Sequence, residues 1–580
     1  MSDHEQHPET KEDWPSFDER LLAPEPPPLP RWSARFATPL TRLDIAVLGL
    51  IVLATALTYF LRLGAPDDLI PLDEKHYVPD ARDVLAFGTE SDTRVSEESG
   101  AFVVHPPVGK WFIAAGIRLL GDDPTGWRFF GAFVGTLSVV LLYLMARRLW
   151  ASAWFAALAS LLLATEGLWF VQSRIAMLDI YLAFFVLAGV WLLLEDRDRT
   201  GIEHRRVRWW RRVRWWRLGA GTAVAFALAT KWSALPFWAA ALLLAAVFEG
   251  RRLGERRRFV GPVFEPAPAW ALLRAAAGVA GTFLVLPALI YVSTFTPWLV
   301  DKDRYDPPRC VSTAEEPRNL ASRWLCYQYE MLDFHRNLNK YETVTEDEEV
   351  EQPDGSTVTV TETVTKPTHP YFSQGYAIPW IGRPVAHYYE TEGEGSAERR
   401  SEVLGAPNPL TWGAAFLIGI PALMWWSVVA PIRRWWSRRR DPVARGRGPS
   451  DTVAPLLLLL IVVGYAPILA ADVVARPVFM FYATPMVPFL VLAVVHVLVR
   501  ATQGGLRARA IPIAFAGLAV LLFAYLYPVY SAWPLSSDGF LGWSGRILYG
   551  SQPWRLFGWQ LPFPPVDCLA ENVIKRFCWI

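Results

Sequence analysis

Long runs of apolar residues alternate with shorter polar segments along most of the chain. A helix needs about 20 apolar residues to cross the hydrocarbon core of a bilayer. Runs of about this length lie at 44–63, 127–146, 152–171, 175–194, 216–230, 233–249, 269–293, 410–431, 453–472, 477–499 and 511–530. The pattern therefore predicts an all-α polytopic membrane protein with about 11 transmembrane helices.

One further apolar run, at 111–120, is too short to cross a bilayer. We expect it to form a helix that lies along the membrane surface or re-enters it, within a first outer loop at 64–126. If this run crossed the membrane, each later loop would lie on the opposite side.

Arginine clusters decide between these two topologies. They occur in the loops 147–151, 195–215, 250–268, 432–452 and 500–510. Cytoplasmic loops are enriched in Lys and Arg. Eleven spans with a cytoplasmic N-terminus place all five clusters inside, whereas the alternative count scatters or inverts them.

The predicted topology divides the chain into five parts. They are a disordered cytoplasmic tail (1–40), a transmembrane module (41–293), a large outer loop (294–409), a four-helix transmembrane module (410–530) and an extracytoplasmic tail (531–580). The first part lacks the basic start and short apolar core of a signal peptide.

The large outer loop, between the seventh and eighth predicted spans, is expected to be of mixed structure. Alternating Thr and Val on either side of Pro353-Asp354-Gly355 predict an exposed β-hairpin, within 341–367. Hydrophobic residues make up 52% of the chain and the net charge is only +1, so the composition suggests no nucleic-acid partner.

All four cysteines fall in segments predicted to lie outside: Cys310, Cys326, Cys568 and Cys578. An even number of exterior cysteines suggests disulfides, with Cys310–Cys326 and Cys568–Cys578 the simplest pairing. Free thiols beside apolar surface are the alternative, since sequence alone cannot fix connectivity.

The first outer loop contains a carboxylate pair, Asp73-Glu74, and later a histidine and a lysine, His105 and Lys110. Taken singly, these residues could be solvated acids and a surface histidine. Their position beside a membrane, together with other charges on the same face, favours an active site. A carboxylate there could act as a base on an incoming hydroxyl.

Four more charged residues lie at the outer ends of predicted spans: Arg174, Asp179, Lys231 and Arg476. Ionisable groups at the membrane edge are functional hypotheses by default, although Asp179 could belong to a structural ion pair. Lys231 could be a snorkelling lysine, or a point charge that binds phosphate.

The chain has no GxGxxG, GxxxxGK[ST] or HExxH motif, so no nucleotide site is predicted on the cytoplasmic side. An enzyme that works outside the membrane has no ATP or sugar nucleotide available. An activated donor would have to be carried by a lipid.

Several motifs then indicate a family. They are DEKHYVPDA at 73–81, VVHPPVGKW at 103–111, GWRFFGA at 126–132, SRIAMLDIY at 173–181, TKWSAL at 230–235 and HPYFSQGYAIPWIGRPVAHYYE at 369–390. In this order they make the chain, over roughly 40–560, resemble the bacterial protein O-mannosyltransferases. These are the dolichyl- or polyprenyl-phosphate-mannose:protein mannosyltransferases of the GT-C class of glycosyltransferases.

The resemblance implies a GT-C fold and an inverting transfer of mannose from a polyprenyl-phosphate donor to Ser or Thr hydroxyls of secreted proteins. It implies no metal and no other cofactor. The expected setting is a bacterial plasma membrane, with the active site and C-terminus outside. The Sec translocon is a further expected partner.

The resemblance also assigns roles to residues. Asp73 would be the catalytic base, with Glu74 orienting the acceptor or the sugar. Arg174 and Lys231 would contact the donor phosphate. The donor and sugar pocket would include His105, Lys110, Asp179 and, from its place at the outer end of a span, Arg476. An acceptor-side or structural role falls to His369, Trp380 and Arg383.

Other functions remain open at this stage. A GT-C enzyme could instead glycosylate a cell-wall glycan or a glycolipid, although the motifs at 230–235 and 369–390 argue against this. The outer loop lacks the β-trefoil repeats of the eukaryotic enzymes, so acceptor choice must use other surfaces. A transporter would need polar residues through the depth of several helices, whereas these charges gather at one face. An inactive scaffold is disfavoured because Asp73 is present.

Overall fold

The computed structural model describes residues 40–90, 104–199, 213–260, 269–300, 319–351, 357–369, 371–433, 436, 452–502, 510–537, 541–546, 555–556 and 559–560. The predicted N-terminal tail up to residue 39 lies outside the described residues, as do Cys310, Cys568 and Cys578.

Eight described helices are long and apolar enough to cross a membrane, by length and composition. Four are single helices: α2 (Arg42–Phe60), α5 (Pro124–Trp150), α18 (Val453–Val473) and α20 (Ala510–Tyr530). The other four are built from successive pieces. Trp232–Leu253 combines η2 (Trp232–Ala234) with α10 (Leu235–Val260), and Ala269–Thr294 combines α11 (Ala269–Ala280), η3 (Gly281–Val285) and α12 (Leu286–Thr294). Pro409–Arg433 combines α15 (Pro409–Ala414), η7 (Ala415–Gly419), α16 (Ile420–Met424), η8 (Trp425–Val429) and the helical residues 430–433, and Met480–Ala501 combines η9 (Met480–Met486) with α19 (Val487–Ala501).

The remaining three predicted spans coincide with shorter or more highly charged helices: α6 (Ala153–Ala164) with α7 (Gly167–Gln172), α8 (Asp179–Arg199) and α9 (Trp215–Leu228). The structure thus agrees with a polytopic helical protein, while the count of eleven spans stays a prediction.

A buried acid explains the break between α6 and α7. The Glu166 carboxylate accepts hydrogen bonds from the backbone N–H of Trp169 at 2.8 Å and of Asn408 at 2.9 Å. It therefore caps the start of α7 and ties it to the residues just before α15.

The buried fraction of each candidate span identifies the centre of the bundle. The segments Met480–Ala501 and Pro124–Trp150 are buried over 83% and 67% of their apolar windows, more than the other candidate spans. α8 packs against both α5 and η9. The first turn of α8 and the residues of η9 therefore meet near the middle of one end of the bundle.

The other end of α8 carries a network of ion pairs. Arg148 pairs with Glu195 and, at 2.6 Å, with Asp198. Arg214 pairs with Asp196 and, at 2.5 Å, with Glu249. These arginines belong to the loops predicted to be cytoplasmic, so part of the basic charge there is balanced by acids of α8 and α10.

Two helices form the described part of the first outer loop: α3 (Glu74–Phe87) and α4 (Val108–Leu120). The predicted short apolar run lies within α4, which has 13 residues. The backbone N–H of Val108 donates to the Ala229 carbonyl at 3.1 Å. A Cβ at Gly109 would approach Leu178 Cδ2 to 2.6 Å, so a larger residue there would require the Leu178 side chain to move.

The large outer loop contains both helices and strands. The strands β1 (Tyr341–Glu351) and β2 (Thr357–Pro367) pair antiparallel, from Tyr341↔Pro367 to Glu351↔Thr357, which confirms the predicted hairpin. A second sheet has the order β3 (Val385–Glu392), β4 (Arg399–Gly405) and β5 (Leu535–Ser536), so it joins the loop to the chain after α20. The smaller elements are α13 (Thr296–Val300), α14 (Leu320–Asn337), η5 (Gly375–Trp380), η6 (Gly395–Ala397), α21 (Trp543–Arg546), β6 (Arg555–Leu556) and β7 (Trp559–Gln560).

Helix α14 is held by a disulfide and by a small apolar cluster. Cys326 is disulfide-bonded. The other three cysteines lie outside the described residues, so the pairing with Cys310 stays a prediction. Tyr327 and Met331 of α14 pack with Phe295 and Trp298 in a hydrophobic cluster separate from the main core.

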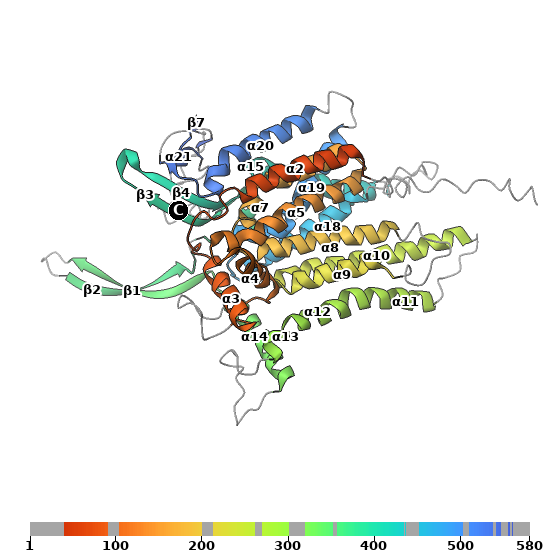
Figure 1. Ribbon diagram of the computed structural model, residues 1–580, viewed down its shortest axis with the longest axis horizontal. Coiled ribbons are helices and arrows are strands. Elements are labelled where there is room, and N and C mark those ends of the chain that lie inside the picture. Colours follow the sequence, from red (N-terminus) through yellow and green to blue (C-terminus); the bar gives the residue numbers. More distant parts are fainter. Residues whose placement is uncertain are drawn as a thin grey trace, which may run out of the picture.

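Figure 1 shows α3, α4, α14 and the strands β1 to β4 gathered at one end of the helix bundle. These elements all come from segments that the arginine pattern assigns to the same side of the membrane. The end of the bundle that carries them also carries the candidate site.

Candidate active site

Asp73 is the residue before α3 and is half-buried. The Tyr77 hydroxyl, one helical turn further on, donates a hydrogen bond to Asp73 Oδ2 at 3.4 Å. Burial raises the pKa of the Asp73 carboxyl to about 6, with Lys231 lowering it and Asp179 raising it. A carboxyl that ionises near pH 6 is ionised at neutral pH and basic enough to accept a proton.

Lys231 and Asp179 form an ion pair, with Nζ 2.9 Å from Oδ2. Asp179 is the first residue of α8 and Lys231 precedes η2, so the pair joins two membrane helices at the outer end predicted for both. Burial alone would lower the pKa of Lys231, but Asp179, Tyr482 and Asp73 raise it above its usual value. The lysine is therefore charged, and the structural ion pair considered for Asp179 is present.

Tyr482 of η9 lies beside this pair. Its ring centroid is 5.1 Å from Lys231 Nζ. Tyr482 is within electrostatic range of Asp73 and Asp179, and also of Arg476. The structure thus brings together four charged residues predicted from the sequence, around a tyrosine that was not predicted.

Glu74 has a different environment from its neighbour. It is fully buried and forms a two-point contact with Arg128 of α5, at 2.7 and 3.2 Å. Its carboxylate also accepts from the backbone N–H groups of Ile70 and Ala176. The expected contact of Glu74 with acceptor or sugar does not fit this placement, because both oxygens are engaged inside the protein. Glu74 anchors the segment that carries Asp73.

Arg174 also differs from expectation. Its guanidinium donates to the backbone carbonyls of Tyr59 at 2.6 Å, Leu61 at 2.8 Å and Arg62 at 2.9 Å, with a longer contact to Thr58. Arg174 therefore caps the C-terminal end of α2, where carbonyls lack helical partners. A contact with the donor phosphate stays a prediction, and the structure supplies other partners for this side chain.

Lys110 is fully buried and lies between two carboxylates. Its Nζ is 2.8 Å from Asp80 Oδ2 and 2.7 Å from Glu90 Oε1. These ion pairs tie the start of α4 to the middle and the end of α3. Any role of Lys110 in a donor pocket would be through this support of α3.

His105 lies between α3 and helix α14 of the large outer loop. Its ring centroid is 6.2 Å from that of Tyr77 and 5.3 Å from that of His335 on α14. Burial and nearby cations, Lys231 among them, hold the pKa of His105 well below its usual value, so the ring is neutral. His105 Nδ1 has no hydrogen-bond partner among the described residues.

Arg476 completes this group of residues. Its Nη2 lies 2.9 Å from His335 Nδ1. No carboxylate pairs with Arg476 in the described part of the chain, and its buried Nε has no hydrogen-bond partner there. The guanidinium thus keeps both charge and donors for a ligand.

The three residues predicted for the acceptor side have different surroundings. His369 accepts from the backbone N–H of Tyr371 at 3.1 Å and is within electrostatic range of Lys75 in α3. Trp380 is 57% exposed. Arg383 has a φ of 58° and its guanidinium lies 5.9 Å from the Phe372 ring centroid. Only His369 is thereby brought close to the start of α3.

Four residues of the site were not predicted as site residues: Tyr77, Arg128, His335 and Tyr482. Tyr77 and Arg128 stand inside motifs quoted above, so those motifs carried the signal. His335 and Tyr482 have no such marker, because only the fold brings α14 and η9 to the first outer loop.

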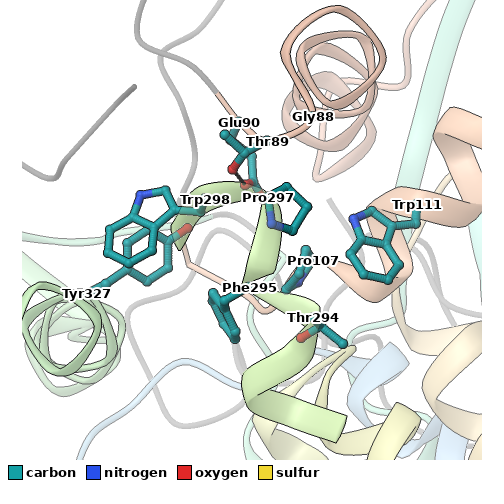
Figure 2. Close-up of a pocket in the computed structure, with 10 residues that line it drawn as sticks. All are labelled: Gly88, Thr89, Glu90, Pro107, Trp111, Thr294, Phe295, Pro297, Trp298 and Tyr327. Atoms are coloured by element: carbon teal, nitrogen blue, oxygen red, sulfur yellow. Dashed lines mark hydrogen bonds between the residues drawn. The ribbon is translucent and has the colours of Figure 1, made fainter. Parts of the chain in front are cut away.

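A pocket opens next to the Lys110 network, and Figure 2 shows its walls. It holds roughly 270 Å³ of empty space, part of it open to solvent. Trp111 of α4 faces Trp298 and Tyr327 of the α13 and α14 region, with Pro107 between them. Glu90 both lines the pocket and pairs with Lys110, so the pocket borders α3 and α4 on the side of the large outer loop.

Comparison with known proteins gives consistent results. The profile of a family described as dolichyl-phosphate-mannose-protein mannosyltransferase matches residues 123–299. A protein from Mycolicibacterium smegmatis named polyprenol-phosphate-mannose–protein mannosyltransferase is 32% identical over 526 residues, which cover 85% of this chain and 90% of that protein. A protein of the same name from Corynebacterium glutamicum is 29% identical over 517 residues, or 82% and 85% of the two chains.

Solved structures agree in fold. The protein O-mannosyltransferase Pmt1–Pmt2 complex of S. cerevisiae, bound to the sugar donor, aligns with a TM-score of 0.59 at 15% identity. The alignment covers 87% of this chain and 92% of that chain, which agrees with the GT-C architecture implied by the motifs. The chain therefore belongs to the family of polyprenol-phosphate-mannose–protein mannosyltransferases and is a membrane glycosyltransferase.

Proposed function

We propose that the enzyme transfers mannose from polyprenyl-phosphate mannose to Ser or Thr hydroxyls of secreted proteins, with inversion at the anomeric carbon. The names of the relatives support this donor and a protein acceptor. The observation that carries the proposal is the Asp73 carboxyl, within electrostatic range of the Lys231–Asp179 pair at one end of a membrane helix bundle.

In the proposed reaction the acceptor oxygen attacks the anomeric carbon as the bond to the phosphate oxygen breaks. The hydroxyl proton passes to Asp73, and polyprenyl phosphate leaves. A serine hydroxyl is a weak nucleophile at neutral pH, so a carboxylate within hydrogen-bond reach accelerates the attack. A single displacement needs one base and no protein nucleophile, so Asp73 is sufficient.

The leaving phosphate gains negative charge in the transition state, and cations stabilise it there. We assign this role to Arg476 and Lys231. Arg476 has donors to spare, and Asp179 is the only ion-pair partner of Lys231 among the described residues. Arg174 is less suited, because its guanidinium is occupied by the carbonyls at the end of α2.

The other predicted residues would act around this centre. Glu74 positions Asp73 through Arg128. Lys110 holds α3 through Asp80 and Glu90, and His105 packs on Tyr77. His369 approaches α3 from the large outer loop, which supports a place for that loop on the acceptor side.

We extend the proposal to the setting of the enzyme. Eleven spans, a cytoplasmic N-terminus and an active site outside a bacterial plasma membrane fit the arginine clusters. The gathering of α3, α4, α14 and the strands at one end of the bundle supports this arrangement. Secreted polypeptides would then meet the site as they emerge, so the Sec translocon is a natural partner. Side-chain cations can stabilise the leaving phosphate, and we propose that no metal or other cofactor is needed.

The acceptor is tested by a transfer assay with purified protein, polyprenyl-phosphate mannose and a Thr-rich peptide. We expect mannose on the peptide. Mannose found only on an added glycan or glycolipid acceptor would refute the protein-acceptor part of the proposal while keeping the donor.

The phosphate contact is tested in the same assay with Lys231→Ala. We expect the KM for the donor to rise about tenfold, since a charge-assisted contact is lost. An unchanged donor KM would reduce Lys231 to a partner of Asp179.

A further inference from the structure

We propose that His335 of α14 is a positioning residue that holds the Arg476 guanidinium in place for the phosphate of the lipid-linked donor. The inference rests on the proposed function, because it concerns the group that binds the donor phosphate there. It makes the large outer loop part of the donor site as well as of the acceptor side.

The first support is the pair of hydrogen bonds made by the His335 imidazole. Its Nδ1 lies 2.9 Å from Arg476 Nη2, and a guanidinium can only donate, so Nδ1 is the acceptor. The ring also forms a hydrogen bond to the backbone of Val104. With Nδ1 accepting, the ring N–H is on Nε2 and donates to the carbonyl. One neutral tautomer therefore satisfies both partners.

The second support is that His335 is neutral. Burial lowers the pKa of His335 to about 4, with further lowering by Arg476 and Lys231. A neutral acceptor orients the guanidinium without cancelling its charge. A carboxylate in the same place would offset the charge of Arg476.

The third support is the packing of α14. Tyr327, Met331 and His335 are spaced four residues apart, so they lie along one face of the helix. The first two pack into the cluster with Phe295 and Trp298. The same face, one turn further on, presents His335 to Arg476.

Helix α14 also touches the turn that carries Lys231. Trp232 Nε1 donates to the Tyr291 hydroxyl at 3.0 Å, and that hydroxyl donates to Gln328 Oε1 of α14 at 2.5 Å. The Trp232 ring centroid lies 6.3 Å from that of His335. Helix α14 is thus linked to both cations assigned to the phosphate. It contacts Arg476 directly through His335, and it reaches the turn that carries Lys231 through Tyr291 and Trp232.

Two substitutions separate the two hydrogen bonds. His335→Asn places Oδ1 where Nδ1 lies and keeps an acceptor for Arg476. His335→Gln places its amide near the position of Nε2 and keeps the contact with Val104. We expect the donor KM of the Asn variant to stay within about twofold of the wild type, and that of the Gln variant to rise about tenfold.

A double-mutant cycle tests whether His335 acts through Arg476. Arg476→Ala alone should raise the donor KM, and adding His335→Gln to it should change nothing further. Arg336→Ala, an exposed cation on the next residue of α14, is the matched control and should behave as wild type. Two results would overturn the proposal. One is an additive rise in the donor KM in the double mutant, and the other is a near-normal donor KM for the Gln variant with a raised one for the Asn variant.

The measurements use the full-length purified protein, with melting temperature as the check on folding. If His335→Gln does not fold, His335→Ala replaces it with the same expectation. If neither His335→Gln nor His335→Ala folds while Arg476→Ala does, His335 is a structural residue and the proposal is refuted.

Binding of polyprenyl phosphate is measured for each variant without any acceptor. One outcome is that the Gln variant binds polyprenyl phosphate more weakly than the Asn variant while the wild type does not mannosylate the peptide. This outcome would refute the proposed acceptor and support this inference. Normal transfer with unchanged donor binding in all His335 variants would refute this inference alone.

Discussion

Arg174 and Arg476 both carry a guanidinium near a helix end that is predicted to lie outside the membrane, yet their partners differ. Arg174 donates to carbonyls at the end of α2, which a helix leaves without partners. Arg476 meets a neutral histidine. An anionic ligand would have to displace structural contacts at the first residue, whereas the second offers it unused donors. At this scale, the partners of a charged residue decide its function more than its charge does.

The pH dependence of transfer should report Asp73. A base must be ionised, and the pKa of Asp73 is raised to about 6. We therefore expect kcat/KM to fall about tenfold per pH unit below pH 6 and to level off above it. The pKa values of His105 and His335 are lowered, that of His335 to about 4, so neither accounts for a limb near pH 6. A flat profile down to pH 5 would contradict Asp73 as the base.

Substitution of Glu74 separates an anchor from a substrate ligand. Glu74→Ala leaves the buried Arg128 guanidinium without its carboxylate, and we expect a loss of about 3–5 kcal/mol of stability. The measurement is the unfolding of the purified protein, with the exposed Asp67→Ala as control. A Glu74→Ala protein that unfolds like the wild type but transfers no mannose would instead place Glu74 against the substrate.

The residues that sequence reasoning identified share a property: they stand inside local motifs or at the ends of apolar runs. The partners of those residues could not be found in this way. Lys231 and Asp179 are 52 positions apart, and their pairing depends on how two helices pack. Glu74 and Arg128 are likewise joined only by the fold.

At the scale of elements, the apolar pattern predicted helices well because burial in a membrane is read from composition over about 20 residues. The break at Glu166 and the acids at the end of α8 were harder to foresee. There, side chains far apart in sequence satisfy polar groups inside the bundle. The hairpin was predictable for a local reason, since its turn and alternation lie within one stretch.

The hairpin gives a prediction at this scale. Figure 1 shows β1 and β2 extending away from the bundle. The base of the β1–β2 hairpin is held by Lys340, whose Nζ lies 2.6 Å from Asp472 Oδ1, and by the contact between the Tyr341 and Phe372 rings. Replacing 343–365 by a two-residue turn should leave the melting temperature and peptide transfer unchanged. Lost peptide transfer with intact donor binding would make the hairpin part of the acceptor site.

At the scale of the whole molecule, the basic clusters predict which end of the bundle faces the cytoplasm. The described outer-loop elements gather at the opposite end, with Asp73, Lys231 and Arg476. A lipid-linked donor can reach such a site from the bilayer, while a polypeptide reaches it from the aqueous side. The arrangement therefore suits a reaction between a membrane-bound and a water-exposed substrate.

Labelling of single introduced cysteines in intact cells tests this orientation. Ser396→Cys in η6, an exposed position of the large outer loop, should react with an impermeant reagent. Ser450→Cys, in the arginine-rich loop 432–452, should react only after the cells are opened. Strong labelling of residue 450 from outside would invert the proposed topology.

If Asp73 is the general base of mannosyl transfer, removing its basicity should stop the reaction. The most direct test is the transfer assay with Asp73→Asn, which keeps the size of the side chain and removes its basicity. We predict a loss of at least about 10²–10⁴-fold in kcat, with unchanged melting temperature and donor binding. Turnover by the folded Asp73→Asn enzyme at a rate close to that of the wild type would contradict the claim.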